Sequence, residues 1–306
     1  MESVMQYLRN LFYFTCPERI AAPIAAFLLA LVFITFWVRN RVWIWSVLTI
    51  FSLFFLYKGA LISPYAVLIV LLLAILHSLL LLKMKGGMRG SMIALVTLLS
   101  WLLCTHFIPG FRFWSPEVSL GHVDLHPPSS LFLHFDTPWI GLFPLALTLS
   151  LFRPSWRLFI CRIFLPACAA VLILVAAAYY FSLSSFKFGK LDMGIFSIFA
   201  TLFFRILPEE GFYRTFLQRE LNAFCQTKRM KVYPLLAVAL IHTVMEATLL
   251  SLNPFNQGIC FLYLLVSRMI YSTTYACTGS VESTILSRFF LYLTSLFFFA
   301  PPIPSI

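Results

Sequence analysis

The sequence predicts an all-α protein, a polytopic transmembrane helix bundle of about ten spans. Of its 306 residues, 61% are hydrophobic and only 11% are charged. Soluble domains carry about 25% charged residues. The apolar residues fall in segments long enough to cross a bilayer as helices, which satisfy their own backbone hydrogen bonds in lipid. Thirty-four Phe and seven Trp suit contact with lipid tails and with the membrane interface.

The expected helices are apolar segments separated by polar or basic loops. They cover residues 21–38, 42–57, 64–83, 92–109, 138–152, 158–182, 193–216, 233–252, 258–276 and 284–300. No linker rich in Ser, Pro or Gly divides the chain, so we expect one integral membrane unit. Within it, residues 1–130 are expected to supply N-terminal transmembrane helices and residues 131–306 the core helices.

Membrane orientation is the simplest explanation of the net charge of +11. The Lys and Arg clusters lie in alternate loops, at residues 39–41, 83–89, 153–157 and 219–231. Basic loops face the cytoplasm, so the slightly acidic loop 110–137 and both termini are expected outside. A nucleic-acid partner is not expected, because it would need a basic patch on a soluble fold. Short loops and the lack of targeting features favour the cytoplasmic (inner) membrane of a bacterium.

The stretch PEEGFYR, at residues 208–214, places two carboxylates and an arginine inside an apolar segment. One ionisable side chain at the centre of a membrane helix costs roughly 2.5–3.5 kcal/mol, and such residues indicate a functional site. Glu210 and Arg214 are four residues apart and share a helix face, as do Arg205 and Glu209. Pro208 removes one backbone donor and is expected to loosen the helix beside the carboxylates.

The next apolar segment carries His242 near its middle and Glu246 one turn further on. A buried carboxylate beside an imidazole can take a proton from water and stabilise an oxyanion. Glu209 is therefore the candidate general base and His242 its partner. Structural explanations stay open: an ion pair between Glu210 and Arg214 that fixes packing, and a His242 bonded to a backbone carbonyl. For Glu246 the favoured interpretation is a carboxyl that only packs.

These residues resemble the CPBP family, the CAAX-protease and bacteriocin-processing (Abi) family of glutamic intramembrane endopeptidases. Its signature is EExxxR, FxxxH and HxxxN on three successive core helices. Glu209, Glu210 and Arg214 match the first motif, and His242 matches the second, with Val238 in place of Phe. The segment LHFDTPWIGLF, at residues 133–143, also resembles the LNxDKxxxGL stretch before the core of some bacterial members.

The third motif departs from the family pattern. In TGSVESTILSRFFLYL, the positions of the family's His and Asn hold Arg288 and Tyr292. Arg288 can still stabilise an oxyanion and Tyr292 can donate a hydrogen bond, but neither is a neutral imidazole. An alternative interpretation has Arg288 extending to the inner membrane interface.

The resemblance implies an intramembrane endopeptidase that hydrolyses a membrane-associated protein or peptide with a glutamate-activated water. The implied catalytic residues are Glu209, Glu210, Arg214, His242 and Arg288. Two other hypotheses remain: an inactive relative that acts as a binding or immunity protein, and a proton-coupled transporter. No inverted repeat is visible in the sequence, which disfavours the transporter.

No cofactor or metal is required by this mechanism. Four histidines, His106, His122, His126 and His134, lie in or near the long loop. Their spacing is irregular and no Cys accompanies them, so the sequence predicts no metal site there.

Overall fold

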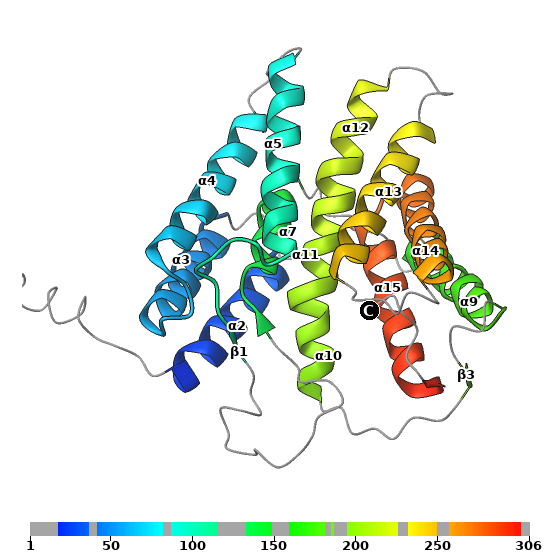
Figure 1. The fold of residues 1–306 in the computed structure, drawn as a ribbon, viewed down its shortest axis with the longest axis horizontal. Helices are drawn as coiled ribbons and strands as arrows, with labels where there is room; N and C mark the ends of the chain where they lie inside the picture. Colours follow the sequence, from blue (N-terminus) through cyan, green and yellow to red (C-terminus); the bar gives the residue numbers. More distant parts are fainter. Residues whose placement is uncertain are drawn as a thin grey trace, which may run out of the picture.

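A computed structural model of the chain describes residues 18–36, 42–81, 87–114, 133–148, 159–180, 185–186, 195–225, 232–249 and 257–300. Each predicted apolar segment contains a helix within these ranges (Figure 1). The all-α prediction is therefore confirmed. Two antiparallel ladders of two-residue strands were not expected. They arise where segments outside the helices run side by side: β1 with β2, and β3 with β4, which follows the last helix.

The helices are arranged around one long rod at the centre of Figure 1. The N-terminal helices, on one side of it, are α2 (Glu18–Thr35), α3 (Val42–Lys58), α4 (Pro64–Leu81) and α5 (Gly87–Cys104). After α7 (Thr137–Thr148), a π-helical turn η1 (Ile160–Phe164) leads into α9 (Leu165–Tyr180). The central rod comprises α10 (Ile195–Thr201), η2 (Leu202–Ile206), α11 (Leu207–Glu210), η3 (Gly211–Gln218) and α12 (Arg219–Phe224). On its other side lie α9, α13 (Val232–Leu249), α14 (Gln257–Thr278) and α15 (Val281–Phe298).

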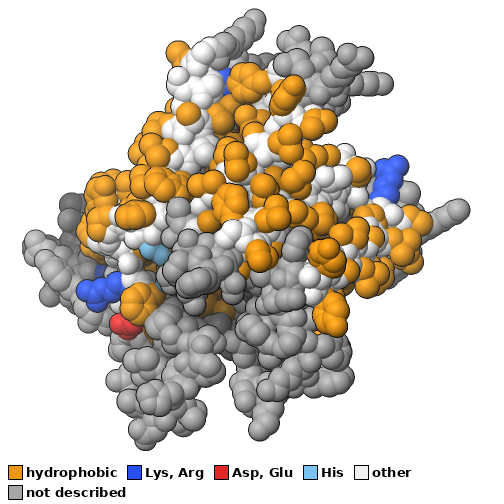
Figure 2. Space-filling model, turned by 45° about the vertical axis from the view of Figure 1, so that its right-hand side comes forward, with side chains coloured by type: hydrophobic (Ala, Val, Ile, Leu, Met, Phe, Trp, Pro, Cys, Tyr) orange, Lys and Arg blue, Asp and Glu red, His pale blue; other side chains and the backbone are white. Residues whose placement is uncertain are grey.

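The exposed surface is apolar, as a membrane protein requires. Three described helices are long and apolar enough to cross a membrane: Gly87–Cys104, Ile160–Tyr180 and Gly258–Thr278. Large hydrophobic side chains such as Phe107 and Leu172 are exposed, and hydrophobic side chains dominate the described surface in Figure 2. Lipid is the solvent that suits such a surface, and the protein is an integral membrane protein. The number of spans stays a prediction.

Contacts between connecting segments show which helix ends lie together. The backbone N–H of Ser63, between α3 and α4, donates to the carbonyl of Gly110, after α5, at 2.8 Å. Strand β1 (Phe113–Trp114) pairs with β2 (Leu133–His134). Strand β3 (Ser185–Phe186) pairs with β4 (Phe299–Ala300), after the last helix. Each contact joins segments that the predicted orientation places on the same side of the membrane.

The other end of the bundle is joined by an ion pair. The Nη2 atom of Arg89, at the start of α5, lies 2.6 Å from a carboxylate oxygen of Glu220 in α12. Both residues belong to segments predicted to face the cytoplasm. The pair connects the N-terminal helices to the central rod. The predicted orientation places both of its residues on the same side of the membrane.

Helix α7 packs closely against the central rod at two glycines. A Cβ atom on Gly141 would fall on the backbone of Pro208. A Cβ atom on Gly211 would lie 2.7 Å from Cγ of Leu145. Only glycine permits such an approach of two backbones, so Gly141 sets the distance between α7 and the residues next to Glu209.

We expect Gly141→Ala to destabilise the protein by about 1–3 kcal/mol, because the methyl group forces α7 away from Pro208. The measurement is thermal unfolding of the purified protein in detergent. Gly90→Ala is the matched control, since a Cβ atom on this glycine of α5 would meet nothing within 4 Å. Equal melting temperatures in the two variants would contradict this account of the packing.

Candidate active site

The two adjacent carboxylates lie on α11, a short α-helical stretch between two π-helical ones, η2 and η3. The loosening expected beside Pro208 thus takes the form of wider helical turns on both sides of it. Such turns change the direction of side chains and frequently occur at functional sites. Glu209 is 9% exposed and Glu210 is fully buried.

The carboxylate of Glu209 is contacted by side chains from three helices. The Nη2 atom of Arg288 in α15 lies 2.8 Å from Oε2, and Nε2 of His242 in α13 lies 3.4 Å from the same oxygen. From the preceding turn, Nε of Arg205 lies 3.5 Å from Oε1. Glu209, His242 and Arg288, which come from three different motifs of the sequence, therefore meet at one point.

Glu210 is held by a second set of contacts. The Nε atom of Arg214 donates to its Oε2 at 3.1 Å, which is the predicted pair four residues apart. The Nη1 atom of Arg288 donates to its Oε1 at 3.2 Å. Arg288 thus uses one Nη atom of its guanidinium for each carboxylate, and it connects the two glutamates.

Arg214 is fixed in turn by α14 and by its own helix. Its Nη1 atom donates to the hydroxyl of Ser272 at 2.5 Å and to Gln218 at 3.4 Å. The Nε2 atom of Gln218 also donates to the backbone carbonyl of Ser272, at 3.0 Å. Because Arg214 is fully buried, the contacts of its Nη1 atom satisfy a donor group that has no access to water and hold the side chain beside Glu210. Its Nη2 atom has no hydrogen-bond partner among the described residues.

His242 is held flat against an aromatic ring. Its imidazole stacks on Tyr213, with ring centroids 3.6 Å apart and an angle of 14° between the planes. The Tyr213 hydroxyl donates to the sulfur of Met245 at 3.1 Å. Among the described residues, Nδ1 of His242 has no hydrogen-bond partner. The stacking fixes the ring so that Nε2 faces Glu209, and the bond to a carbonyl considered from the sequence is not formed by the described residues.

Glu246 belongs to the same network of charges. Its Oε2 accepts a hydrogen bond from Nε of Arg268 in α14, at 2.9 Å. Its Oε1 lies 3.4 Å from Nη2 of Arg205, which also approaches Glu209. Glu246 is therefore a paired carboxylate, whereas the sequence left open whether it is protonated or paired. Its partners connect it through Arg205 to the Glu209 site.

Arg288 does not extend to the membrane interface, so that interpretation is wrong. It is 4% exposed, and Tyr292, one turn later, is also buried. Gly279, with φ of +67°, ends α14 and lets the chain reverse into α15. This turn brings α15 back along the bundle and places Arg288 opposite α11.

The part of the chain that contains this cluster matches a known family. Residues 191–294, about one third of the chain, match the family model for type II CAAX prenyl endopeptidase Rce1-like proteins. This segment is therefore similar to that family. The match agrees with the resemblance that the first two motifs indicated. No curated protein and no solved structure gives a significant match.

The Rce1-like segment includes every residue of the predicted site. It brings Glu209, Glu210, Arg214, His242 and Arg288 into one connected cluster. Sequence reasoning missed Arg268 and Ser272, which lie on α14 and hold Glu246 and Arg214. A signal was present for Arg268, since it is a lone arginine in an apolar segment. The segment lies within residues 131–306, the predicted core.

Proposed function

We propose that this protein is an intramembrane endopeptidase that cleaves a membrane-associated protein or peptide. One observation supports this most strongly. The Glu209 carboxylate meets His242 and Arg288 inside a segment that matches an endopeptidase family. General base catalysis needs a carboxylate near a donor that stabilises negative charge, and this arrangement supplies both at bilayer depth.

In the proposed reaction, Glu209 takes a proton from a water molecule as that water attacks the carbonyl carbon of the substrate. His242, with its Nε2 atom directed at Glu209, helps to orient this water. The attack produces a tetrahedral oxyanion. Collapse of this intermediate breaks the C–N bond, and Glu209 returns its proton to the leaving amine.

The oxyanion is stabilised by Arg288 in this proposal. Its Nη2 atom already lies 2.8 Å from Glu209, so a modest movement of the guanidinium reaches an oxyanion formed beside that carboxylate. Glu210 and Arg214 hold the position and charge of the site. A well-placed donor to an oxyanion contributes roughly 2.7–4 kcal/mol of transition-state stabilisation.

The name of the matched family refers to CAAX prenyl endopeptidases, so a prenylated CAAX tail is the test substrate, and the natural substrate of a bacterial member is a separate question. Such tails carry a prenyl chain that inserts in the membrane and delivers the peptide to an enzyme embedded there. We place the protein in the cytoplasmic membrane of a bacterium. Residues 131–306 would carry the catalytic core, and residues 1–130 would support it in the bilayer.

The proposal predicts that purified protein in liposomes cleaves a fluorescence-quenched, prenylated CAAX peptide, with the released fragment identified by mass spectrometry. The same peptide without its prenyl group should be cleaved more slowly, because the membrane does not concentrate it. Cleavage that is equally fast with Glu209→Gln protein would point to a contaminating protease and contradict the proposal.

A second candidate is an inactive relative that binds a peptide without cleaving it. The observation that favours it is the replacement of the family's third-motif His by Arg288, whose two Nη atoms each contact a glutamate. Binding of the prenylated peptide by folded protein, with no fragment released from it, would support this candidate over the peptidase.

A further inference from the structure

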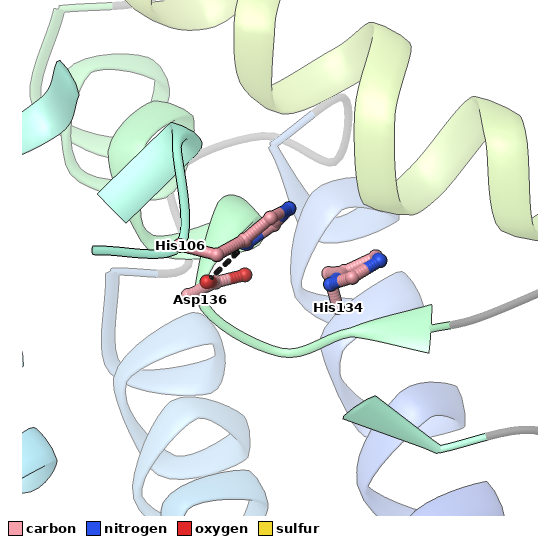
Figure 3. A group of neighbouring side chains, drawn as sticks. All are labelled: His106, His134 and Asp136. Atoms are coloured by element: carbon pink, nitrogen blue, oxygen red, sulfur yellow. Dashed lines mark hydrogen bonds and ion pairs between the residues drawn. The ribbon is translucent and has the colours of Figure 1, made fainter. Parts of the chain in front are cut away.

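A cluster of two imidazoles and a carboxylate lies outside the Glu209 network. His106 follows the end of α5, His134 is in β2, and Asp136 directly precedes α7. One ligand atom from each side chain lies within 4.8 Å of the others. The rings of His106 and His134 stack, with centroids 4.0 Å apart, and Figure 3 shows both beside Asp136.

Local structure brings the three residues together from segments that are far apart in the sequence. His106, with φ of +58°, turns the chain after α5, and the β1–β2 ladder places His134 opposite Phe113. Asp136 uses one oxygen to accept the backbone N–H of Thr137, at 2.8 Å, and thereby caps α7. Its other oxygen lies 2.5 Å from Nδ1 of His106.

A helix cap explains only part of this arrangement. A cap needs the first carboxylate oxygen, and the hydrogen bond with His106 uses the second. Neither the helix cap nor this hydrogen bond explains why the His134 ring stacks on that of His106. Two His nitrogens and one carboxylate oxygen are a ligand set that suits Zn²⁺, with a fourth position left for water.

The dimensions of the cluster are close to those of a zinc site. Bonds of about 2.0–2.1 Å in a tetrahedral site place ligand atoms roughly 3.3 Å apart. The ligand atoms here all lie within 4.8 Å of one another, and a rotation of the stacked rings about their side-chain torsions is needed to direct one nitrogen of each at a common ion. Asp136 is 5% exposed and His106 is 36% exposed, so the site has a fixed carboxylate and an open side through which an ion can enter.

We propose that His106, His134 and Asp136 bind Zn²⁺ and that the ion fastens the end of α5 to the start of α7. Helix α7 carries Gly141, which contacts Pro208 beside Glu209. A metal at this point would therefore stabilise the packing of the N-terminal helices against the central rod. The site does not depend on the proposed peptidase activity and differs from the sequence-based expectation of no metal.

The experiment is a titration of the chelator-treated full-length protein in detergent with ZnCl₂, combined with metal analysis and thermal unfolding. Wild-type protein should bind one Zn²⁺ and melt at a higher temperature with zinc than in EDTA. His106→Gln, His134→Gln and Asp136→Asn should each weaken binding at least about 10-fold. The Asn side chain retains an oxygen that can cap α7, so Asp136→Asn tests the loss of charge with the cap kept.

His77→Gln is the control, since it removes a described histidine that lies in α4 and does not belong to the cluster. We expect this variant to bind zinc as the wild type does. Melting in EDTA shows that each variant folds without metal. The proposal is wrong if wild-type protein binds no zinc, or if His106→Gln and His134→Gln keep wild-type affinity.

Discussion

Glu209→Gln is expected to lower the rate of peptide cleavage at least about 100-fold, because it removes the general base and keeps the size of the side chain. The amide keeps one acceptor oxygen in place of two, so one of the two arginines loses its partner at this position, while Arg288 keeps Glu210 and Arg205 keeps Glu246. The melting temperature in detergent should fall, so cleavage is compared per folded molecule. The measurement is kcat/KM for the prenylated peptide, together with thermal unfolding of the same preparation.

Glu220→Gln is the matched control for this variant. Glu220 is also a buried carboxylate on the central rod that pairs with an arginine, but its partner is Arg89, at the start of α5. Loss of that pair can change stability, and cleavage per folded molecule should stay near the wild-type value. Full cleavage activity in Glu209→Gln would contradict the proposed mechanism. An equal loss of cleavage in both variants would mean that the effect comes from disturbed packing.

The sequence was most informative where charge lies inside apolar segments. Glu209, Glu210 and Arg214 were identified because ionisable residues at bilayer depth are costly, and the pairing of Glu210 with Arg214 follows from their helical spacing. The positions of the helices could also be predicted from the sequence. In lipid, an isolated membrane-spanning segment can form all its backbone hydrogen bonds only as a helix. Both predictions depend on local pattern alone.

Contacts between distant segments could not be derived in this way. Arg288 contacts both Glu209 and Glu210 because α15 packs on α11. The spacing of residues within one helix does not determine that packing. The same holds for Arg268, which meets Glu246 across two helices. Irregular spacing also concealed the cluster of His106 and His134, because the β1–β2 ladder rather than a single helix brings these residues together.

Boundaries deviated where backbone geometry overrode the apolar pattern. The helix predicted at residues 92–109 is α5, Gly87–Cys104. It begins earlier because the polar residues at its start are still helical. It ends earlier because His106 adopts a positive φ, which a helix does not continue through.

Arg288→Ala is expected to reduce cleavage by about 100- to 1000-fold, the effect of losing one oxyanion donor. It also leaves two glutamates without a shared counter-charge. Breaking a buried pair costs about 3–5 kcal/mol, so the melting temperature should fall as well. Activity is therefore compared per folded molecule, at a temperature where thermal unfolding shows the variant to be native. Arg288→Lys serves as the control that keeps the charge and loses the fork.

The double variant Arg288→His with Tyr292→Asn restores the residues of the family's third motif. Both positions lie on one face of α15, four residues apart, so an imidazole and an amide would replace the guanidinium beside Glu209. We expect cleavage to equal or exceed that of the wild type, because the two side chains supply the donors that Arg288 now directs to glutamates. A large loss in Arg288→Ala without rescue in the double variant would show that Arg288 has become the oxyanion donor itself. No cleavage by any folded variant, the wild type included, would contradict the peptidase and favour the inactive relative.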